Sequence, residues 1–203
     1  MSQAQGSPPR YCAYFCEENI WHLCAHPRVA DSERAALFIT NPKRRVAVWG
    51  QRLCTDPDLP IAWDYHVVLL FRPPGARWQA WDLDCHVREP QPAQTWLLSS
   101  FRGAQVLPPE FLPRFRLVPA DDYRRHLRSD RRHMRDAAGE ELQPHPSWAP
   151  ILGEPLPAEA AEADEGHNLD RFLDTENPDF LGRVFDLREL LAHLAQTETR
   201  AEA

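Results

Sequence analysis

The stretch WDYHVVLLFR at residues 63–72 decides the fold of this chain. Its apolar run at 67–71 is typical of a strand that is buried on both faces. The turn signal PPG follows at 73–75, and RWQAWD at 77–82 then alternates apolar and polar residues. The two segments therefore predict a β-hairpin in the middle of a sheet.

Further strands and helices are expected around this hairpin. Apolar or alternating runs predict strands at 35–40, 45–49, 115–119 and 182–185. Amphipathic or capped runs predict helices that begin at Cys16 and at 93, 120, 168 and 186, the last with Asp186 as its N-cap. A helix, then a mostly antiparallel sheet, then helices that pack on it define an α+β fold class.

Length and composition favour a single folded domain. The chain has 203 residues, of which 43% are hydrophobic, and this is enough for a core. The first ten residues (1–10) are predicted to be a flexible leader, because SPP at 7–9 blocks regular structure. One domain is expected over 11–196, with a Pro-, Ala- and Glu-rich extended loop at 137–166 and a polar tail at 197–203.

Charge and cysteine content exclude several classes of protein. A net charge of −7 argues against a nucleic-acid-binding surface, and no run of about 18 apolar residues predicts a membrane span. The N-terminus has no apolar core of signal-peptide length, and the five cysteines are odd in number and scattered. We therefore expect a monomeric cytoplasmic protein with reduced thiols, which in a eukaryote could also be nuclear.

Three residues form the constellation that carries chemistry: Cys16, His66 and Asp82. Cys16 stands at the predicted helix start, where the free N–H groups lower the pKa of a thiol and can receive an oxyanion. His66 lies in the central strand, and Asp82 ends the strand predicted to pair with it. Such a pair lets His66 take the thiol proton while Asp82 fixes the orientation of the imidazole.

Each of the three residues also has a plain structural interpretation. A lone cysteine is more often a small buried apolar residue than a nucleophile. A histidine in an apolar strand is more often a satisfied core residue, and an aspartate at a strand end is more often a turn residue. Only their joint placement, a helix start beside two paired strands, favours catalysis.

A zinc site is another possible use of the cysteines. The residues that could ligate zinc are Cys12, Cys16, Cys24, His22, His26, Cys85 and His86. The spacing of Cys12 and Cys16 fits a zinc knuckle, but His22 and His26 share a helix face from which Cys24 points away. We therefore expect no metal.

Five segments resemble the protein N-terminal glutamine amidohydrolases. They are YCAYFCEENIW at 11–21, IAWDYHVVLL at 61–70, WDLD at 81–84, FRLVPADDY at 115–123 and SDRRHM at 129–134. The resemblance implies an α/β/α sandwich with a papain- or transglutaminase-like cysteine hydrolase core. It also implies that Cys16 is the nucleophile, that His66 is the base, and that Asp82 rather than Asp84 completes the triad.

The family converts an N-terminal glutamine of a protein or peptide to glutamate and releases ammonia, in the arginylation branch of the N-degron pathway. The resemblance therefore implies a thioester mechanism without a cofactor, and partners that carry a free N-terminal glutamine. Two alternatives stay open: a related thiol peptidase or transglutaminase, and a non-catalytic module that binds N-terminal residues. The segment at 152–166 and the Cys85-His86 pair depart from the family pattern.

Recognition of an N-terminal residue requires a partner for its α-ammonium group, and a carboxylate satisfies that need. The candidates are Glu17 and Asp64, followed by Glu18. The aromatic side chains expected to surround the glutamine methylenes are Phe15, Trp63 and Tyr65. The charged run at 129–134 is either a solvated face or part of the substrate mouth through Asp130 or His133.

Overall fold

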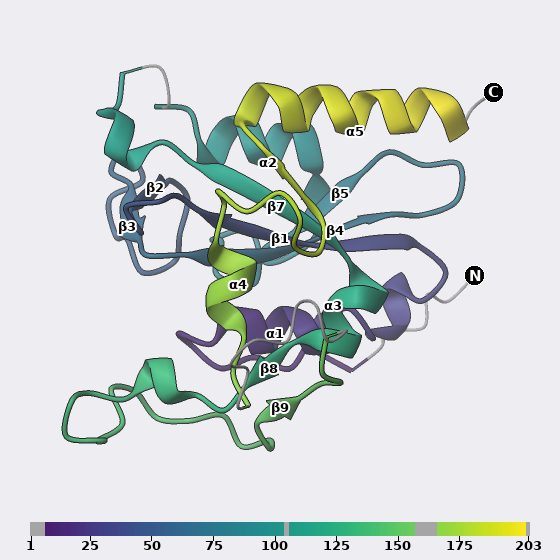
Figure 1. Cartoon of the computed structure of the whole chain (residues 1–203). Helices are drawn as coiled ribbons and strands as arrows, with labels where there is room; N and C mark the ends of the chain where they lie inside the picture. Colours follow the sequence, from purple (N-terminus) through teal and green to yellow (C-terminus); the bar gives the residue numbers. More distant parts are fainter. Residues whose placement is uncertain (1–6, 104–105, 157–165, 202–203) are drawn as a thin grey trace.

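A six-stranded sheet forms the centre of the molecule in the computed structural model, which describes residues 7–103, 106–156 and 166–201 (Figure 1). The strand order is β10-β7-β1-β4-β5-β6, and every pairing between neighbours is antiparallel. The strands are β1 (Glu33–Thr40), β4 (His66–Arg72), β5 (Gln79–Trp81), β6 (Gln91–Pro92), β7 (Arg114–Pro119) and β10 (Arg183–Phe185). The predicted hairpin is confirmed as β4–β5.

Helices cover both faces of this sheet, so the chain has three layers (Figure 1). One face carries α2 (Ala93–Ser100) and α5 (Leu187–Ala201). The other face carries α1 (Cys16–Leu23), α3 (Ala120–His126) and α4 (Leu169–Leu173). The α+β class with a mostly antiparallel central sheet is therefore confirmed.

The strand alternation explains the two cores. Val67, Leu69 and Phe71 of β4 pack toward α1 and α3, whereas Val68 and Leu70 pack toward α2 and α5. All five side chains are buried. A strand that is apolar at consecutive positions fits the middle of such a sandwich, because both of its faces meet helices.

The sequence predicted one continuous strand over 63–72, but the structure divides this segment between two strands. β3 (Ile61–Trp63) pairs with β2 (Val46–Val48) in a separate two-stranded sheet, and β4 begins only at His66. Between them, the Asp64 carbonyl accepts a 2.7 Å hydrogen bond from the Thr40 hydroxyl. Periodicity cannot detect this interruption, because the residues on both sides of it are extended.

The C-terminal helix continues to Ala201, so the polar residues from 197, predicted as a tail, are helical as far as they are described. Trp78 Nε1 donates to Thr197 Oγ1 at 2.9 Å, and the Trp78 N–H donates to Glu198 Oε1 at 2.8 Å. These bonds hold the last turns against the sheet. At the other end, reciprocal bonds between Asp186 and Glu189 form a capping box, which confirms the predicted cap.

Two predicted irregular segments are partly ordered by contacts. The loop at 137–166 contains β9 (Ile151–Leu152), which pairs with β8 (Arg128–Ser129), while residues 157–165 lie outside the described part. In the leader, residues 7–10 have no regular structure, and the Ser7 carbonyl contacts His26 Nε2 at 2.8 Å; residues 1–6 lie outside the described part. The short 3₁₀ helices are η1 (Pro27–Val29), η2 (Pro109–Phe111) and η3 (Arg132–Met134). None of the helices described here has the length and apolar character needed to cross a bilayer.

Candidate active site

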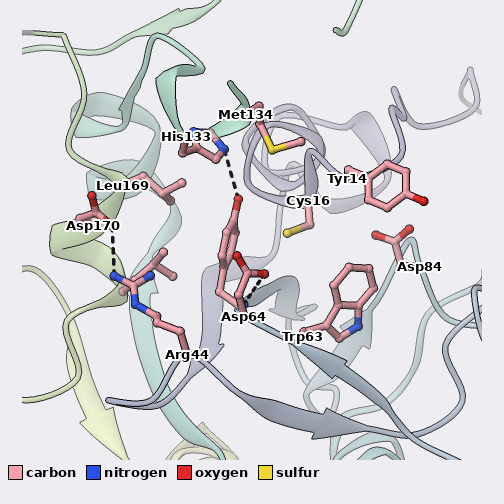
Figure 2. A pocket seen from close by; sticks show the side chains of 12 residues that line it. Tyr14, Cys16, Arg44, Trp63, Asp64, Asp84, His133, Met134, Leu169 and Asp170 are labelled. Carbon is pink, nitrogen blue, oxygen red and sulfur yellow. Dashed lines mark hydrogen bonds and ion pairs between the residues drawn. The ribbon is translucent and has the colours of Figure 1, made fainter. Parts of the chain in front are cut away.

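A pocket of about 180 Å³ lies where α1 begins beside the start of β4 (Figure 2). It is small compared with sites for drug-sized ligands, which span about 300–1,000 Å³, and it suits a single side chain. Figure 2 shows the Cys16 sulfur with Trp63 and Asp84 on one side and His133 on the other. The lining residues are Tyr14, Cys16, Arg44, Trp63, Asp64, Tyr65, Asp84, His133, Met134, Leu169, Asp170 and Leu173.

Cys16 occupies the first position of α1, as predicted. Phe15 is the N-cap and makes no side-chain capping bond, so its side chain leaves the positively polarised helix start uncapped. Tyr14 immediately before it has a φ of 70°, a left-handed conformation that is uncommon for a bulky residue. Strain of this kind is held only where the surroundings impose it, and here it precedes the thiol in the pocket wall.

The pKa of the Cys16 thiol differs in direction from the expectation. Burial raises this pKa well above its ordinary value, and the carboxylates of Glu17 and Asp84 act in the same direction. The backbone N–H of Val67 acts on the sulfur as a hydrogen-bond donor and lowers the pKa, but by less. The prediction of a lowered thiol pKa was wrong, because it counted the helix start and omitted the desolvation. The thiol therefore needs a base when it attacks.

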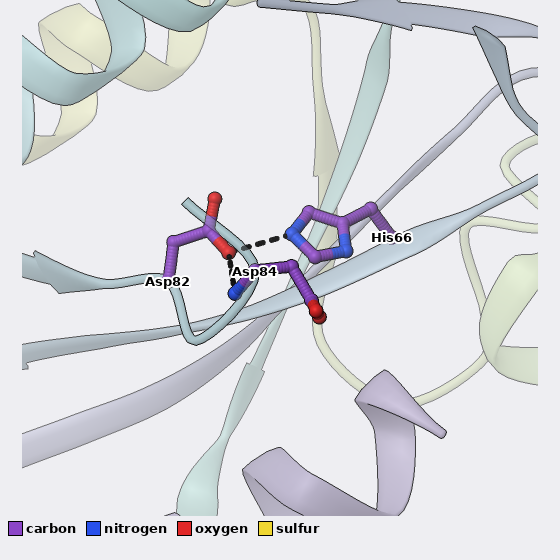
Figure 3. A group of neighbouring side chains, drawn as sticks. All are labelled: His66, Asp82 and Asp84. Atoms are coloured by element: carbon purple, nitrogen blue, oxygen red, sulfur yellow. Dashed lines mark hydrogen bonds and ion pairs between the residues drawn. The ribbon is translucent and has the colours of Figure 1, made fainter. Parts of the chain in front are cut away.

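His66 and Asp82 form a buried pair (Figure 3). His66 Nε2 lies 2.9 Å from Asp82 Oδ1, and both side chains are inaccessible to solvent. Burial lowers the pKa of His66, but the charge of Asp82 and the hydrogen bond to it more than compensate and raise the pKa. For Asp82, burial raises the pKa, but His66 and Gln51 lower it below its ordinary value.

The second imidazole nitrogen, His66 Nδ1, is left for chemistry. It is buried and has no hydrogen-bond partner among the residues that the structure describes. Val67, the next residue in the chain, reaches the Cys16 sulfur with its N–H, so the thiol lies beside the start of β4. The structure thus brings Cys16, His66 and Asp82 together, with Nδ1 as the nitrogen free to accept a proton.

Gln51 supports this pair, and sequence reasoning missed it. Its Nε2 donates to Asp82 Oδ2 at 2.9 Å, and its Oε1 accepts from Trp63 Nε1 at 3.3 Å. The Trp63 ring stacks on His66, with centroids 5.6 Å apart and planes 11° from parallel. Gln51 lies after β2 in an isolated bridge to Cys85, a position that no motif marks.

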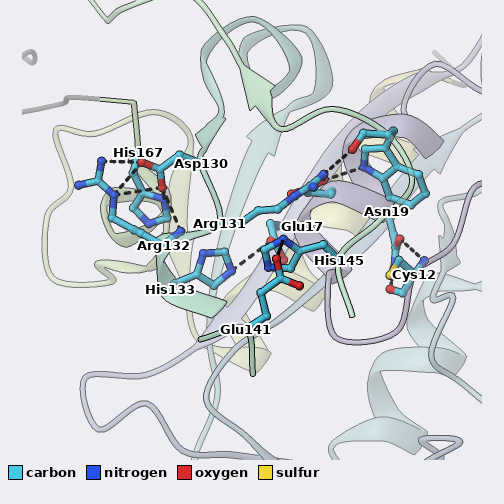
Figure 4. A network of polar contacts seen from close by, with 12 residues as sticks. Cys12, Glu17, Asn19, Asp130, Arg131, Arg132, His133, Glu141, His145 and His167 are labelled. Atoms are coloured by element: carbon cyan, nitrogen blue, oxygen red, sulfur yellow. Dashed lines mark hydrogen bonds and ion pairs between the residues drawn. The ribbon is translucent and has the colours of Figure 1, made fainter. Parts of the chain in front are cut away.

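Phe15 and Glu17 do not line the pocket, contrary to the predicted substrate contacts. Both are fully buried. The Glu17 carboxylate accepts from the Tyr65 hydroxyl at 2.9 Å and lies 3.3 Å from His133 Nε2. The Phe15 ring packs edge-on against His145. The first turn of α1 is covered by the 130–148 segment, which the helical periodicity alone does not reveal (Figure 4).

Glu18 is also unavailable to a ligand. It accepts two 2.7 Å bonds from Arg131, which also donates to the Trp148 carbonyl. The Trp148 indole donates to the same carboxylate at 2.6 Å. Glu18 therefore anchors the covering segment to α1.

The remaining candidates, Trp63, Asp64 and Tyr65, line the pocket from the break between β3 and β4. His133 also lines the pocket. The sequence left open whether the run at 129–134 is a solvated face or part of the pocket mouth, and for His133 the structure favours the mouth. Asp84 had a signal in the WDLD motif, where only its neighbour Asp82 was assigned a role. The other missed residues come from loops, from η3 and from α4, which no helical or strand periodicity connects to Cys16: Tyr14, Arg44, Met134, Leu169, Asp170 and Leu173.

One group of side chains has the spacing of a metal site. The potential ligand atoms of His66, Asp82 and Asp84 lie within 4.8 Å of one another. His66 and Asp82 already bond each other, however, which is the arrangement of a proton-transfer pair rather than of two ligands of one ion. Within the described ranges, the cysteines and histidines at 12–26 form no such group, and all five cysteines are free.

Comparison with known proteins identifies the family of this chain. Residues 11–194 match the family described as N-terminal glutamine amidase. The chain is 34% identical to a protein N-terminal glutamine amidohydrolase from Bos taurus, over 91% of this chain and 88% of the relative. It is 33% identical to that of Homo sapiens, over 90% and 88%, and 36% identical to that of Drosophila ananassae, over 70% and 71%. The chain therefore belongs to the N-terminal glutamine amidase family.

Proposed function

We propose that this protein hydrolyses the side-chain amide of an N-terminal glutamine to glutamate and releases ammonia, using Cys16, His66 and Asp82. The relatives that it matches over about nine-tenths of its length bear the name of this activity. The observation that carries the proposal is the buried His66–Asp82 pair, whose His66 Nδ1 has no partner among the described residues. The next residue, Val67, reaches the Cys16 sulfur in the pocket wall with its N–H.

The first half of the reaction makes a thioester. His66 Nδ1 takes the thiol proton as the Cys16 sulfur bonds to the amide carbon, and the carbonyl oxygen becomes an oxyanion. Backbone N–H groups at the start of α1 stabilise this charge. The imidazolium, held by Asp82, then protonates the amide nitrogen, the C–N bond breaks and ammonia leaves.

The second half regenerates the enzyme. A water molecule gives one proton to His66 Nδ1 as its oxygen attacks the thioester carbon, which produces a second tetrahedral oxyanion. This oxyanion collapses and the C–S bond breaks, so that the carboxylic acid of glutamate leaves and the thiolate recovers its proton from the imidazolium. The released acid then loses its remaining proton to solvent and becomes the carboxylate. Burial raises the pKa of the Cys16 thiol, and this favours the return of the proton to sulfur.

The pocket fits this substrate in size and lining. Trp63 and Tyr65 provide apolar surfaces beside the thiol for the glutamine methylenes, and Asp64 adds a negative charge at the mouth. A cysteine on a helix start, a histidine on the first adjacent strand and an aspartate directly after its hairpin partner support a papain- or transglutaminase-like core.

The direct test compares Cys16→Ala with Cys12→Ala on a peptide that begins with glutamine. Cys12 is partly exposed and lies outside the pocket lining, so it is a matched thiol control. We expect ammonia release to disappear in the first variant and to persist in the second. Equal turnover in both would refute the triad.

Product analysis separates the alternative functions. Deamidation leaves the peptide chain intact, whereas a peptidase shortens it and a transglutaminase links it to an amine. A binding module would retain the peptide without releasing ammonia. An asparagine-initiated peptide of the same sequence is the substrate control, because its side chain is one methylene shorter and does not carry the amide to the sulfur.

A further inference from the structure

Three carboxylates line the pocket, and they differ in burial and in the partners that they already bind. Asp170 pairs with Arg44 at 3.1 Å on the exposed rim. Asp64 is exposed, and its Oδ1 accepts the N–H of Tyr65 at 2.9 Å. Water competes strongly for charges in such positions, so each provides little binding energy for a cation.

Asp84 differs because it is buried and only half of its carboxylate is engaged. It is 7% exposed. Oδ1 accepts the Tyr11 hydroxyl at 2.5 Å and lies 3.3 Å from Arg52, which fixes the orientation of the group. No hydrogen bond or ion pair to Oδ2 occurs within the part of the chain that the structure describes.

The position of Asp84 relates it to the reacting atoms. Its carboxylate shares a 4.8 Å cluster with the side chains of His66 and Asp82. Its charge raises the pKa of both the Cys16 thiol and His66. Figure 3 shows the carboxylate turned away from Asp82, and Figure 2 shows it on the same side of the pocket as Trp63.

We propose that the free oxygen of Asp84 binds the α-ammonium group of the substrate glutamine and so restricts the enzyme to N-terminal residues. This inference rests on the proposed deamidation at Cys16. In a bound glutamine, only the Cα and the side-chain methylenes separate the attacked carbon from the α-nitrogen. The ammonium must therefore lie within one side-chain length of the Cys16 sulfur, where Asp84 is the buried carboxylate of the wall.

The same arrangement rejects internal glutamines. An internal residue presents a neutral peptide N–H in place of the ammonium and continues into a preceding chain. A desolvated carboxylate gains a strong, charge-assisted bond from an ammonium and little from a neutral amide. Asp84 therefore favours the free N-terminus.

The test uses two variants and two substrates. Asp84→Asn keeps the shape of the side chain and removes its charge, and Asp64→Asn is the matched control at the exposed carboxylate of the same pocket. The substrates are a glutamine-initiated peptide and its des-amino analogue, in which hydrogen replaces the α-ammonium. The measurement is kcat/KM for ammonia release from each substrate.

We expect Asp84→Asn to lower kcat/KM for the glutamine peptide about 10- to 100-fold more than for the des-amino analogue. Asp64→Asn should change the ratio between the two substrates by less than about threefold. This ratio does not depend on the folded fraction of the variant. If Asp84→Asn yields no soluble protein, Asp84→Ser answers the same question.

Three results would overturn the assignment. If Asp84→Asn lowered kcat/KM for both substrates equally, Asp84 would act only through His66 and Asp82. The assignment would also fail if Asp84→Asn kept the wild-type ratio of kcat/KM between the glutamine peptide and its des-amino analogue. A loss of this ratio in Asp64→Asn would place the ammonium at Asp64 instead. Failure of the wild-type protein to deamidate either substrate would instead refute the proposed function, so the two failures are distinguishable.

Discussion

Two carboxylate–histidine pairs lie near Cys16, and they are built differently. Asp82 and His66 are 2.9 Å apart, and both belong to the central hairpin region. Glu17 and His133 are 3.3 Å apart and join α1 to the covering segment at 130–148. The first pair is fully buried, while the His133 side chain is 19% exposed in the pocket wall.

The difference shows that burial and a carboxylate do not by themselves make a catalytic histidine. In both pairs burial lowers the histidine pKa, and the acid outweighs this effect and raises it. The Asp82 oxygens are held by Gln51 and by the Asp84 N–H, so His66 has one fixed position beside the thiol. His133 instead contacts Glu17 and the Tyr65 hydroxyl, and it shapes the mouth.

The largest expected effect separates the two histidines. His66→Ala removes the base and the acid of the proposed mechanism and should lower kcat by about 10³- to 10⁴-fold. His133→Ala should reduce kcat/KM by about tenfold or less, because it changes only the pocket wall. Steady-state ammonia release measures both. Comparable losses in the two variants would remove the distinction.

A second prediction concerns the attachment of the covering segment. Arg131→Ala leaves the Glu18 carboxylate buried without its cation and should reduce the free energy of unfolding by about 3–5 kcal/mol. Arg132→Ala is the neighbouring control: its side chain is 56% exposed and pairs with Asp130 at the surface. Its effect should stay below about 1 kcal/mol. Denaturant titration measures both, and similar losses would contradict the account.

A smaller effect is expected at Gln51. Gln51→Ala removes a donor from buried Asp82 Oδ2 and the acceptor of the Trp63 indole. We expect a loss of about 1–3 kcal/mol in stability and a fall in kcat of about tenfold, with KM less affected. Gln51→Glu, which brings a like charge to Asp82, should be worse than Gln51→Ala. A kcat equal to that of the wild type would show that the aspartate needs no such support.

The sequence predicted the hairpin side of the site better than the covering side. Asp82 reaches His66 through the pairing of neighbouring strands, which a local pattern determines. Helical spacing likewise located Cys16. It could not show that Glu17 and Glu18 are sealed by Arg131, His133 and Trp148, because those contacts join residues more than a hundred positions apart.

The thiol pKa illustrates the same limit in energetic terms. A helix start favours the thiolate, and this effect can be inferred from sequence. The desolvation of Cys16 and the charges of Glu17 and Asp84 depend on the packed structure, and they reverse the direction. Asp84 itself was visible in the WDLD motif, but only the structure shows that one of its oxygens is free.

The smallest predicted effect is a difference in pH dependence. The folded pKa of His133 is above its ordinary value of 6.5, so its stabilising contact with Glu17 is complete below that pH and is lost as the pH rises through the folded pKa. His133→Gln should therefore flatten the decline in stability just above pH 6.5. Activity should instead rise with pH over this range. His66 acts as a base only when it is neutral, and its pKa is above the ordinary value.

Thermal unfolding and kcat/KM, each followed across this pH range, check the two dependences. A wild-type stability that does not fall above pH 6.5, or an activity that falls there, would contradict the assignment of the two histidines.

The most direct test of the account is to trap the covalent intermediate. The protein is mixed with a glutamine-initiated peptide, quenched in acid within the first turnovers, digested and examined by mass spectrometry. The account predicts an adduct of the peptide less ammonia on the fragment that contains Cys16, and none in Cys16→Ala. An adduct on another residue, or ammonia release at the wild-type rate by Cys16→Ala, would contradict it.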